Sequence, residues 1–267
     1  MSEMVYEIRK LRLSFKDMVH KSIFKPAPEI EVLKGLSFDI AKGDILGIVG
    51  GSGSGKSTLG RAMVRLLDPS SGMIRFQGLD ITNLNEDALR PLRRKFQMIF
   101  QDPMSSLNPR RTVFAIIAAP LRLHKFDRIA IRVEEALDMV GLPRDFKNRY
   151  PHELSGGQRQ RVGIARAIAT EPEFVLADEI VSGLDVSSQA QVLNLLEQLV
   201  RDLGLTLAFI SHDLSVIRRL CQRTIVLYQG EIVEAQKTAK LFTNPATAYT
   251  RELIEAIPLP NLDQHWI

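Results

Sequence analysis

The stretch that most constrains how this chain can fold is Gly50–Ser57, which reads Gly-Gly-Ser-Gly-Ser-Gly-Lys-Ser. It matches the phosphate-binding loop pattern G-x-x-x-x-G-K-[ST]. The pattern indicates a phosphate-binding loop only where a buried strand precedes it and a helix follows it, and both elements are predicted here. The apolar run Ile45–Val49 precedes the loop, and a helix reaching about Leu67 follows it. This context favours a ligand-binding loop over a simple glycine-rich turn.

The chemistry of this loop points to a nucleoside triphosphate. Its glycines let successive backbone N–H groups turn inward around an anion, and the N-terminus of the next helix adds its positive dipole end. Lys56 is expected to reach the β- and γ-phosphates, and the Ser57 hydroxyl is expected to bind Mg²⁺. The residues predicted to hold ATP here are Gly50, Gly51, Ser52, Gly53, Ser54, Gly55, Lys56, Ser57 and Thr58.

Short apolar strands alternate with amphipathic helices along the chain, which is typical of an α/β fold with a largely parallel sheet. The predicted strands are 5–13, 36–40, 45–49, 73–77, 96–100, 174–177 and 205–210, with a strand pair over 223–235 that turns at Gln229-Gly230. Between about 105 and 161 the strand pattern is absent, and 128–140 is helical, so a helical insertion is predicted. A long helix after Asp185 places Val186, Ala190, Leu193, Leu196 and Val200 along one stripe.

Composition sets outer limits on the class of protein. With 267 residues, 45% of them hydrophobic, the chain can form one large core with an inserted subdomain. Its single cysteine, Cys221, excludes an internal disulfide or a thiolate metal cluster and is predicted to be a buried apolar filler. We find no signal segment and no apolar stretch of bilayer length, which predicts a cytoplasmic chain without a membrane span.

Two acids close another apolar strand at Phe174-Val175-Leu176-Ala177-Asp178-Glu179. Asp178, at the carboxyl end of the strand, suits a role at Mg²⁺, through a water because Mg²⁺ keeps much of its hydration shell. Glu179, one residue later, is expected to point to the opposite side and to orient or deprotonate an attacking water. Together with the phosphate loop, the pair predicts an ATPase site.

The run Leu154-Ser155-Gly156-Gly157-Gln158 narrows the class further. Ser155 is predicted to cap a helix over about 157–169, and the two glycines leave the backbone open to an anion. With this motif in place, the chain resembles the ATP-binding-cassette (ABC) ATPases, whose signature is LSGGQ. The other ordered motifs are the phosphate loop, Gln101, Asp178-Glu179, Ser182-Gly183-Leu184-Asp185 and Ser211-His212-Asp213.

The resemblance implies a fold and a set of residue roles. The fold would be a P-loop NTPase with a RecA-like core, an N-terminal antiparallel β subdomain and the helical insertion, followed by a C-terminal extension over about 237–267. Gln101 would contact Mg²⁺ and the water, and His212 would bind the γ-phosphate and orient Glu179. Asp185 would lie at a subunit contact. The signature residues Ser155, Gly156, Gly157 and Gln158 would bind the ATP held by a second cassette.

The resemblance also calls for an aromatic side chain stacked on adenine. Phe15, at the end of the first predicted strand, is the first choice, and Phe24 is the rival because 17–30 is a long connection. Both could equally be plain core or surface aromatics.

Further stretches resemble the ATPases of oligopeptide, dipeptide and nickel importers. They are Gln101-Asp102-Pro103-Met104-Ser105-Ser106-Leu107-Asn108-Pro109-Arg110, Leu184-Asp185-Val186-Ser187, and the tail stretches 241–245, 248–253 and 256–258. Two positions depart from that subfamily: Ile180 stands where proline is usual, and Gly183 where alanine is common. Neither change removes a catalytic group, so a hydrolysis-competent site is expected.

The partners implied are a second cassette, identical or related, two membrane permeases and, indirectly, an external solute-binding protein. The chain would then lie peripherally at the cytoplasmic face of the cell membrane. The transported solute stays open. The alternatives are a soluble accessory ATPase, for example of phosphonate breakdown, and a nucleic-acid-linked cassette. The basic stretch 90–95 is better explained as a solvated helix face than as an RNA-binding site, and no nucleic acid partner is expected.

Overall fold

The computed structural model describes residues 3–16, 28–102 and 106–256. At its centre is a six-stranded sheet with the order β10-β9-β3-β8-β7-β6. Five of these strands run parallel, and β10 pairs with β9 in the antiparallel sense. The strands are β3 (Ile45–Val49), β6 (Phe96–Ile99), β7 (Phe174–Asp178), β8 (Thr206–Ile210), β9 (Arg223–Tyr228) and β10 (Glu231–Lys237).

The middle strands of this sheet are buried on both faces. Every residue of β3, β7 and β8 is buried, which explains why these strands read as continuous apolar runs in the sequence. Alternate side chains of β3 enter different cores: Leu46 and Ile48 join one hydrophobic cluster, while Ile45 and Val49 join the other. The predicted parallel α/β core is confirmed.

A second, antiparallel sheet covers one side of the molecule, with the order β2-β1-β4-β5. Its strands are β1 (Met4–Lys16), β2 (Glu29–Ala41), β4 (Ser71–Phe76) and β5 (Leu79–Asp80). Its inner face packs on α1 (Lys56–Met63) and on Leu46 and Ile48, so the phosphate loop starts between the two sheets. The sequence located β1 and β2 but made both too short, because the missed first half of β2 and the end of β1 mix polar and apolar residues and are mostly not buried.

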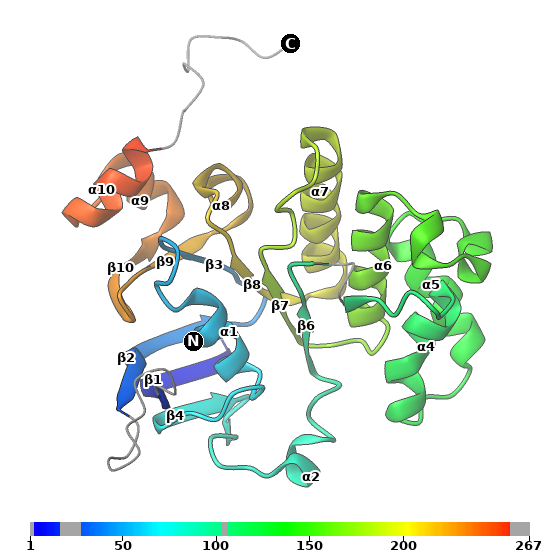
Figure 1. Ribbon diagram of the computed structural model, residues 1–267, viewed down its shortest axis with the longest axis horizontal. Coiled ribbons are helices and arrows are strands. Elements are labelled where there is room, and N and C mark those ends of the chain that lie inside the picture. Colours follow the sequence, from blue (N-terminus) through cyan, green and yellow to red (C-terminus); the bar gives the residue numbers. More distant parts are fainter. Residues whose placement is uncertain (1–2, 17–27, 103–105, 257–267) are drawn as a thin grey trace.

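Helices gather on the other side of the central sheet (Figure 1). They are α4 (Val113–Leu123), α5 (Ile129–Met139), η1 (Arg144–Asn148), η2 (Pro151–Glu153) and α6 (Gly156–Ile168). The helix predicted over 128–140 is confirmed to within one residue at each end. The boundaries of about 105 and 161 for an inserted subdomain stay a prediction, and Ser105 lies outside the described residues.

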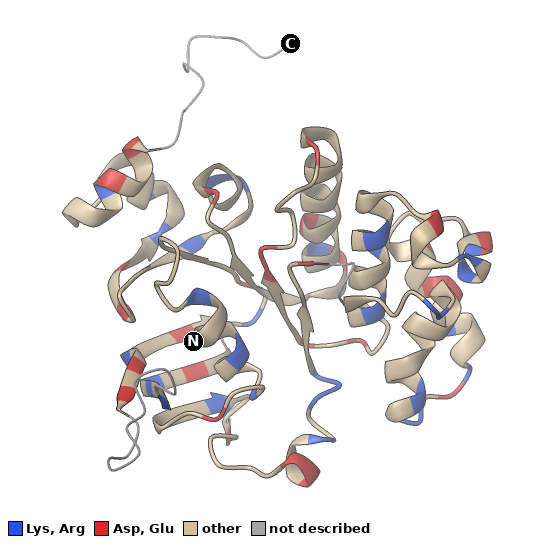
Figure 2. Cartoon of the chain, viewed as in Figure 1, with Lys and Arg blue, Asp and Glu red and all other residues tan. Residues whose placement is uncertain are grey.

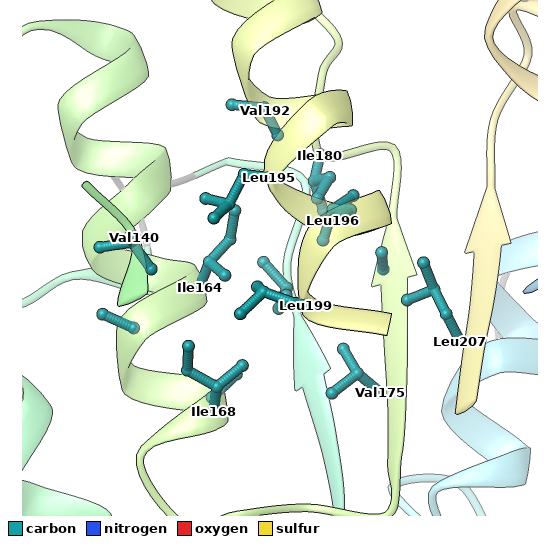
Figure 3. Close-up of a cluster of buried hydrophobic side chains, with 14 of the residues drawn as sticks. Val140, Ile164, Ile168, Val175, Ile180, Val192, Leu195, Leu196, Leu199 and Leu207 are labelled. Carbon is teal, nitrogen blue, oxygen red and sulfur yellow. The ribbon is translucent and has the colours of Figure 1, made fainter. Parts of the chain in front are cut away.

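The long helix α7 (Val186–Leu203) links the helical group to the sheet. Figure 3 shows side chains of α6 and α7 directed toward one another and toward β7 and β8. The buried residues of α7 are Val192, Leu193, Leu195, Leu196 and Leu199. The predicted stripe was therefore wrong at its start. Val186 is 84% exposed, because the first turn of α7 extends beyond the core.

Truncating a residue of this cluster should lower the stability of the fold. Leu196 is 1% exposed, so Leu196→Ala leaves a cavity between α7 and the sheet. We expect the free energy of unfolding to fall by about 3 kcal/mol, since such truncations cost roughly 2–5 kcal/mol. Urea unfolding of the purified chain measures this change. The control Val186→Ala should stay within about 0.5 kcal/mol of the original, and equal losses in the two variants would contradict the packing described here.

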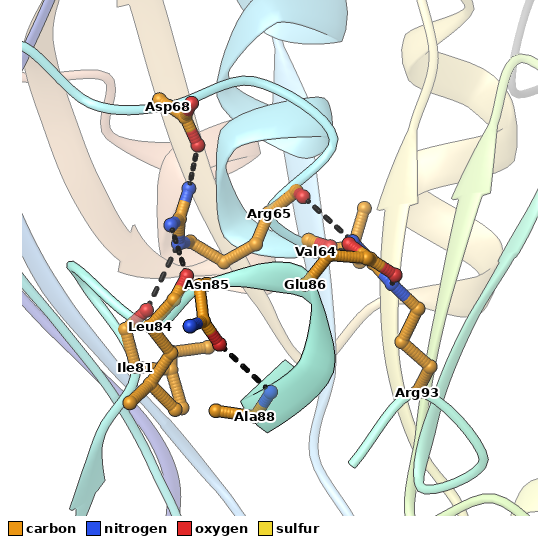
Figure 4. A network of polar contacts seen from close by, with 9 residues as sticks. All are labelled: Val64, Arg65, Asp68, Ile81, Leu84, Asn85, Glu86, Ala88 and Arg93. Atoms are coloured by element: carbon orange, nitrogen blue, oxygen red, sulfur yellow. Dashed lines mark hydrogen bonds and ion pairs between the residues drawn. The ribbon is translucent and has the colours of Figure 1, made fainter. Parts of the chain in front are cut away.

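The helix after the phosphate loop is shorter than predicted. It ends at Met63, and Arg65 adopts a left-handed conformation with φ +52°. The buried Arg65 guanidinium donates to the Ile81 and Leu84 carbonyls and pairs with Asp68 (Figure 4). The predicted last helical turn, up to Leu67, is therefore absent. The Arg65 bonds instead fix the chain where it leaves α1 toward β4.

The basic stretch 90–95 is a turn after α2 (Glu86–Leu89), and its prediction as a helix face was wrong. Arg93 donates to Glu86 and to the carbonyls of Val64 and Arg65 (Figure 4), and Lys95 pairs with Glu173 at 3.0 Å. Both cations hold the turn against its neighbours. Across the chain, positive and negative residues are interspersed over the helices and strands (Figure 2).

The C-terminal part packs beside β9 and β10, on the opposite side from α4 and α5 (Figure 1). It contains α8 (Leu214–Leu220), α9 (Thr238–Thr243) and α10 (Ala248–Glu255), which the sequence did not predict as separate helices. The β9–β10 turn at Gln229-Gly230 is confirmed, with φ +47° and +83°. Cys221 is buried as predicted, and burial raises the pKa of its thiol. No helix in the described ranges has the length and apolarity to cross a bilayer.

Candidate nucleotide-binding site

The candidate residues converge at the carboxyl ends of four neighbouring parallel strands. The phosphate loop follows β3, His212 follows β8, Asp178 ends β7, and Gln101 lies just beyond β6. Because the strand order is β3-β8-β7-β6, the four follow one another along one edge of the sheet. Ligands of open α/β sheets bind at this edge.

The phosphate loop is packed too tightly for side chains at key positions. A Cβ on Gly50 would lie 2.2 Å from the Leu227 carbonyl oxygen, so only glycine fits there. Gly55 is the N-cap of α1 with φ +102°, and no side chain caps that helix. The first N–H groups of α1 are therefore directed toward the loop without a competing side-chain acceptor.

Lys56 lies within the loop that it serves. Its Nζ donates to the Gly50 and Gly51 carbonyl oxygens, each at 2.9 Å, and the residue is buried. Burial lowers the pKa of Lys56, while the charges of Glu179 and Asp178 act in the opposite direction. A phosphate group arriving here would meet a desolvated ammonium held at the loop.

Ser57 and Asp178, the two residues predicted to serve Mg²⁺, are in direct contact. Ser57 Oγ donates to Asp178 Oδ1 at 3.1 Å. Asp178 is 3% exposed, and burial raises the pKa of its carboxyl against the opposing hydrogen bond from Ser57. A cation beside this carboxylate would favour its charged form.

Glu179 does not point to the opposite side from Asp178, so that part of the prediction was wrong. Strand β7 ends at Asp178, and Glu179 adopts a left-handed φ of +50°, which breaks the strand alternation. The Glu179 side chain therefore reaches the same cavity as Lys56 and Ser57. Its Oε2 lies 3.1 Å from His212 Nδ1 and accepts from Gln101 Nε2 at 3.2 Å.

These groups line one open cavity of about 610 Å³, a size suited to a nucleotide. Within the described residues its wall is formed by Val32, Ser52, Gly53, Ser54, Gly55, Lys56, Ser57, Thr58, Gln101, Glu179, Ser182 and His212. Val32 was not predicted, and nothing in its sequence context indicates it. Val32 reaches the cavity because β2 packs beside the phosphate loop.

The adenine-stacking residue stays a prediction. Phe15 lies near the end of β1, paired with Ile30 of β2, and is 42% exposed. It is not among the described residues that line the cavity. Phe24 lies outside the described residues.

The signature residues lie apart from the phosphate loop, at the start of α6. Ser155 Oγ accepts from Gln158 N at 3.3 Å, and Gln158 Oε1 accepts from Ser155 N at 2.9 Å. The predicted N-cap is therefore present, as a capping box. A Cβ on Gly157 would lie 3.1 Å from Ser188 Oγ, so this segment packs against the start of α7.

Asp185 is the N-cap of α7, and its carboxylate accepts from Ser188 N, Ser187 Oγ and Ser188 Oγ. These hydrogen bonds lower the pKa of Asp185 to about 2. Its role at a subunit contact stays a prediction.

The two departures from the importer subfamily have different structural settings. Ile180 is buried in the large cluster beside α7. Gly183 has φ +78°, a conformation that glycine adopts without strain, in the loop before α7.

Comparison with known proteins gives a family match. Residues 33–182 match the model of the family described as ABC transporter. This range includes the phosphate loop, Gln101, Ser155 and Glu179.

Two curated relatives and one solved structure illustrate the similarity. A putative peptide import ATP-binding protein of Brucella ovis is 51% identical over 88% of this chain and 75% of its own length. The oligopeptide transport ATP-binding protein AppF of Bacillus subtilis is 47% identical over 96% and 79%. The dimeric post-hydrolysis structure of the ATP-binding cassette MJ0796, bound to ADP and Pi, has a TM-score of 0.76 and 30% identity, covering 87% of this chain and 98% of that one.

Proposed function

Because the chain belongs to the ABC transporter family, we propose that it is the ATP-binding and ATP-hydrolysing subunit of an importer for peptides or a similar small solute. The names of the relatives support peptides as the solute class. They also favour a transport role over a soluble accessory ATPase of phosphonate breakdown.

One observation carries the hydrolytic role: Lys56, Ser57 and Glu179 line the same cavity, and Asp178 bonds Ser57 behind it. The loop amides and Lys56 hold the phosphates of ATP. Glu179 acts as general base toward a water, with its carboxylate oriented by Gln101 and His212. His212 also reaches the γ-phosphate, since it lines the same cavity.

The oxygen donors at this site suit Mg²⁺, which prefers carboxylate and hydroxyl oxygens over nitrogen ligands. Ser57, Asp178 and Gln101 would hold the ion. When bound there, Mg²⁺ would neutralise part of the charge of the phosphate groups.

A second cassette completes the site in this proposal. Ser155, Gly156, Gly157 and Gln158 line no part of the cavity among the described residues of their own chain. They start a helix at an exposed position, where a helix N-terminus attracts an anion. We place this surface, with Asp185, against the ATP of a partner cassette, and the dimeric cassette structure supports this arrangement.

Permeases dock, in this proposal, at a cavity of about 270 Å³ beside the exposed Phe100, which precedes Gln101. Leu66, Pro120 and Arg166 also line it, so it bridges the α/β core and the helical group. Arg166 Nη1 donates to the Ser106 carbonyl at 2.7 Å, which ties the stretch after Gln101 to α6. The chain would thereby lie peripherally at the cytoplasmic face of the cell membrane, with an external binding protein selecting the solute.

Isolation of the native complex tests the proposal. We expect the tagged full-length chain to co-purify from detergent-solubilised membranes with two permeases and a second cassette, and the complex to hydrolyse ATP. Mass spectrometry identifies the partners and shows whether the second cassette is identical or related. Recovery only in a soluble complex without permeases would contradict the importer role.

A further inference from the structure

A hydroxyl from the C-terminal helix reaches the phosphate loop. Gly51 N–H donates to Tyr249 Oη at 2.8 Å, although Tyr249 lies on α10, 198 residues further along the chain. The expected machinery of phosphate binding and hydrolysis gives no role to this contact. It joins the last described helix to the first peptide of the loop.

The Tyr249 ring is held in place by its neighbours. It packs on Tyr228, at the end of β9, with ring centroids 4.2 Å apart and an interplanar angle of 44°. Tyr228 Oη accepts from Gln229 Nε2 at 3.2 Å, and among the described residues it makes no hydrogen bond to the phosphate loop. Of the two packed tyrosines, Tyr249 is therefore the one whose hydroxyl accepts a hydrogen bond from the phosphate loop.

The segment that carries Tyr249 is anchored by a buried carboxylate. Glu234 of β10 accepts from Ala246 N at 2.9 Å and from Thr247 N at 3.1 Å. Thr247 in turn caps α10 by accepting from Thr250 N at 3.1 Å. Burial raises the pKa of Glu234, but these hydrogen bonds outweigh it and hold the pKa below its ordinary value. Glu234 is therefore charged near neutral pH and fixes the start of α10.

Gly51 provides the space that this contact needs. A Cβ at Gly51 would lie 3.1 Å from Tyr249 Oη, closer than a methyl group and a hydroxyl normally approach. Any larger residue at this position would displace the hydroxyl. Gly51 has no left-handed φ, so its conformation does not itself demand glycine.

The bonded peptide unit links Tyr249 directly to Lys56. The Gly51 N–H and the Gly50 carbonyl belong to one planar peptide. Tyr249 binds that peptide at its N–H, and Lys56 Nζ binds it at its carbonyl oxygen, 2.9 Å away. Rotation of the peptide would break both bonds together.

We propose that Tyr249 is a positioning residue for nucleotide binding, which it serves by fixing the Gly50–Gly51 peptide that holds Lys56. The inference rests on the proposed ATP site. It gives the C-terminal segment a task at that site: α10, anchored by Glu234, supports the phosphate loop. Tyr249 is not among the described residues that line the cavity, so it should affect ATP affinity rather than the chemical step.

The test compares Tyr249→Phe with the matched variant Tyr228→Phe. We expect Tyr249→Phe to raise the Kd of Mg-ATP roughly two- to tenfold, the factor that corresponds to one neutral hydrogen bond. The kcat should change less than the KM for ATP. Tyr228→Phe keeps the ring pair and removes the other hydroxyl, so its Kd should match the original chain. Calorimetry gives Kd, and steady-state hydrolysis by the native complex gives kcat and KM.

A double-mutant cycle separates the hydrogen bond from general packing. Gly51→Ala should weaken ATP binding in the original chain and have a smaller effect beside Tyr249→Phe, because no hydroxyl is then displaced. Strictly additive effects, or equal Kd values for Tyr249→Phe and the original chain, would overturn the inference. If the unaltered chain binds no ATP at all, the proposed function fails instead. Thermal unfolding of each variant identifies any that do not fold.

Discussion

Replacing Glu179 by glutamine is expected to leave ATP binding intact and to lower the rate of hydrolysis by about 10²- to 10⁴-fold, the usual loss when a positioned general base is removed. Glutamine keeps the size of the side chain and one carbonyl acceptor for Gln101 Nε2, 3.2 Å away in the original. It cannot take a proton from water. The structure makes this residue the best-placed base because its carboxylate also lies 3.1 Å from His212 Nδ1.

Two measurements check this expectation: equilibrium ATP binding by the purified chain, and phosphate release by the assembled complex. The control Glu135→Gln makes the same chemical change on the exposed face of α5 and should hydrolyse ATP normally. Phosphate release by Glu179→Gln at more than a tenth of the original rate would remove Glu179 from the role of base. Loss of ATP binding would instead indicate a structural role.

Replacing Lys56 by alanine should weaken ATP binding by about 10- to 100-fold. Charged hydrogen bonds of the kind an ammonium makes to phosphate are worth roughly 1.5–3 kcal/mol, which corresponds to that range. The buried ammonium already lies in the loop, 2.9 Å from two of its carbonyl oxygens, so little rearrangement is needed to meet a phosphate. Alanine removes the charge, and the buried Asp178 and the half-buried Glu179 then repel the nucleotide without compensation.

Titration of the purified chain with Mg-ATP measures this loss. Lys240→Ala, on the exposed face of α9, is the matched control because it removes an equal charge away from the cavity. The same Kd for Lys56→Ala and for the control would refute the assignment of the loop. A loss that shrank at high salt in both variants alike would point to general electrostatics instead.

Local motifs were the most predictable part of the fold. The strand Ile45–Val49, the loop after it and the capping box at Ser155 all depend on residues close together in sequence, and each lies where the pattern placed it. The errors came from single backbone conformations and from packing. The left-handed conformation of Arg65 ends α1 early, and that of Glu179 changes the direction of its own carboxylate. Neither arginine nor glutamate is a residue type that signals this conformation.

Packing caused the remaining differences. Val186 has the same spacing as buried residues of α7, yet it is exposed because the first turn of that helix projects beyond the core. The helical periodicity records which residues share a face, but it does not record how far the neighbouring layer extends. The helices α8, α9 and α10 are short, and so their periodicity is too brief to recognise.

The sequence alone determined the chemistry of phosphate binding, because eight consecutive residues build that loop from their own backbone. Tertiary structure decided which distant groups meet there. Gln101, Glu179 and His212 converge because the strand order β8-β7-β6 aligns the ends of three separate strands. Tyr249 reaches Gly51 because Glu234 anchors α10 beside the loop. No short-range pattern encodes these contacts, since they depend on strand order and on the packing of a helix that is distant in sequence from the loop.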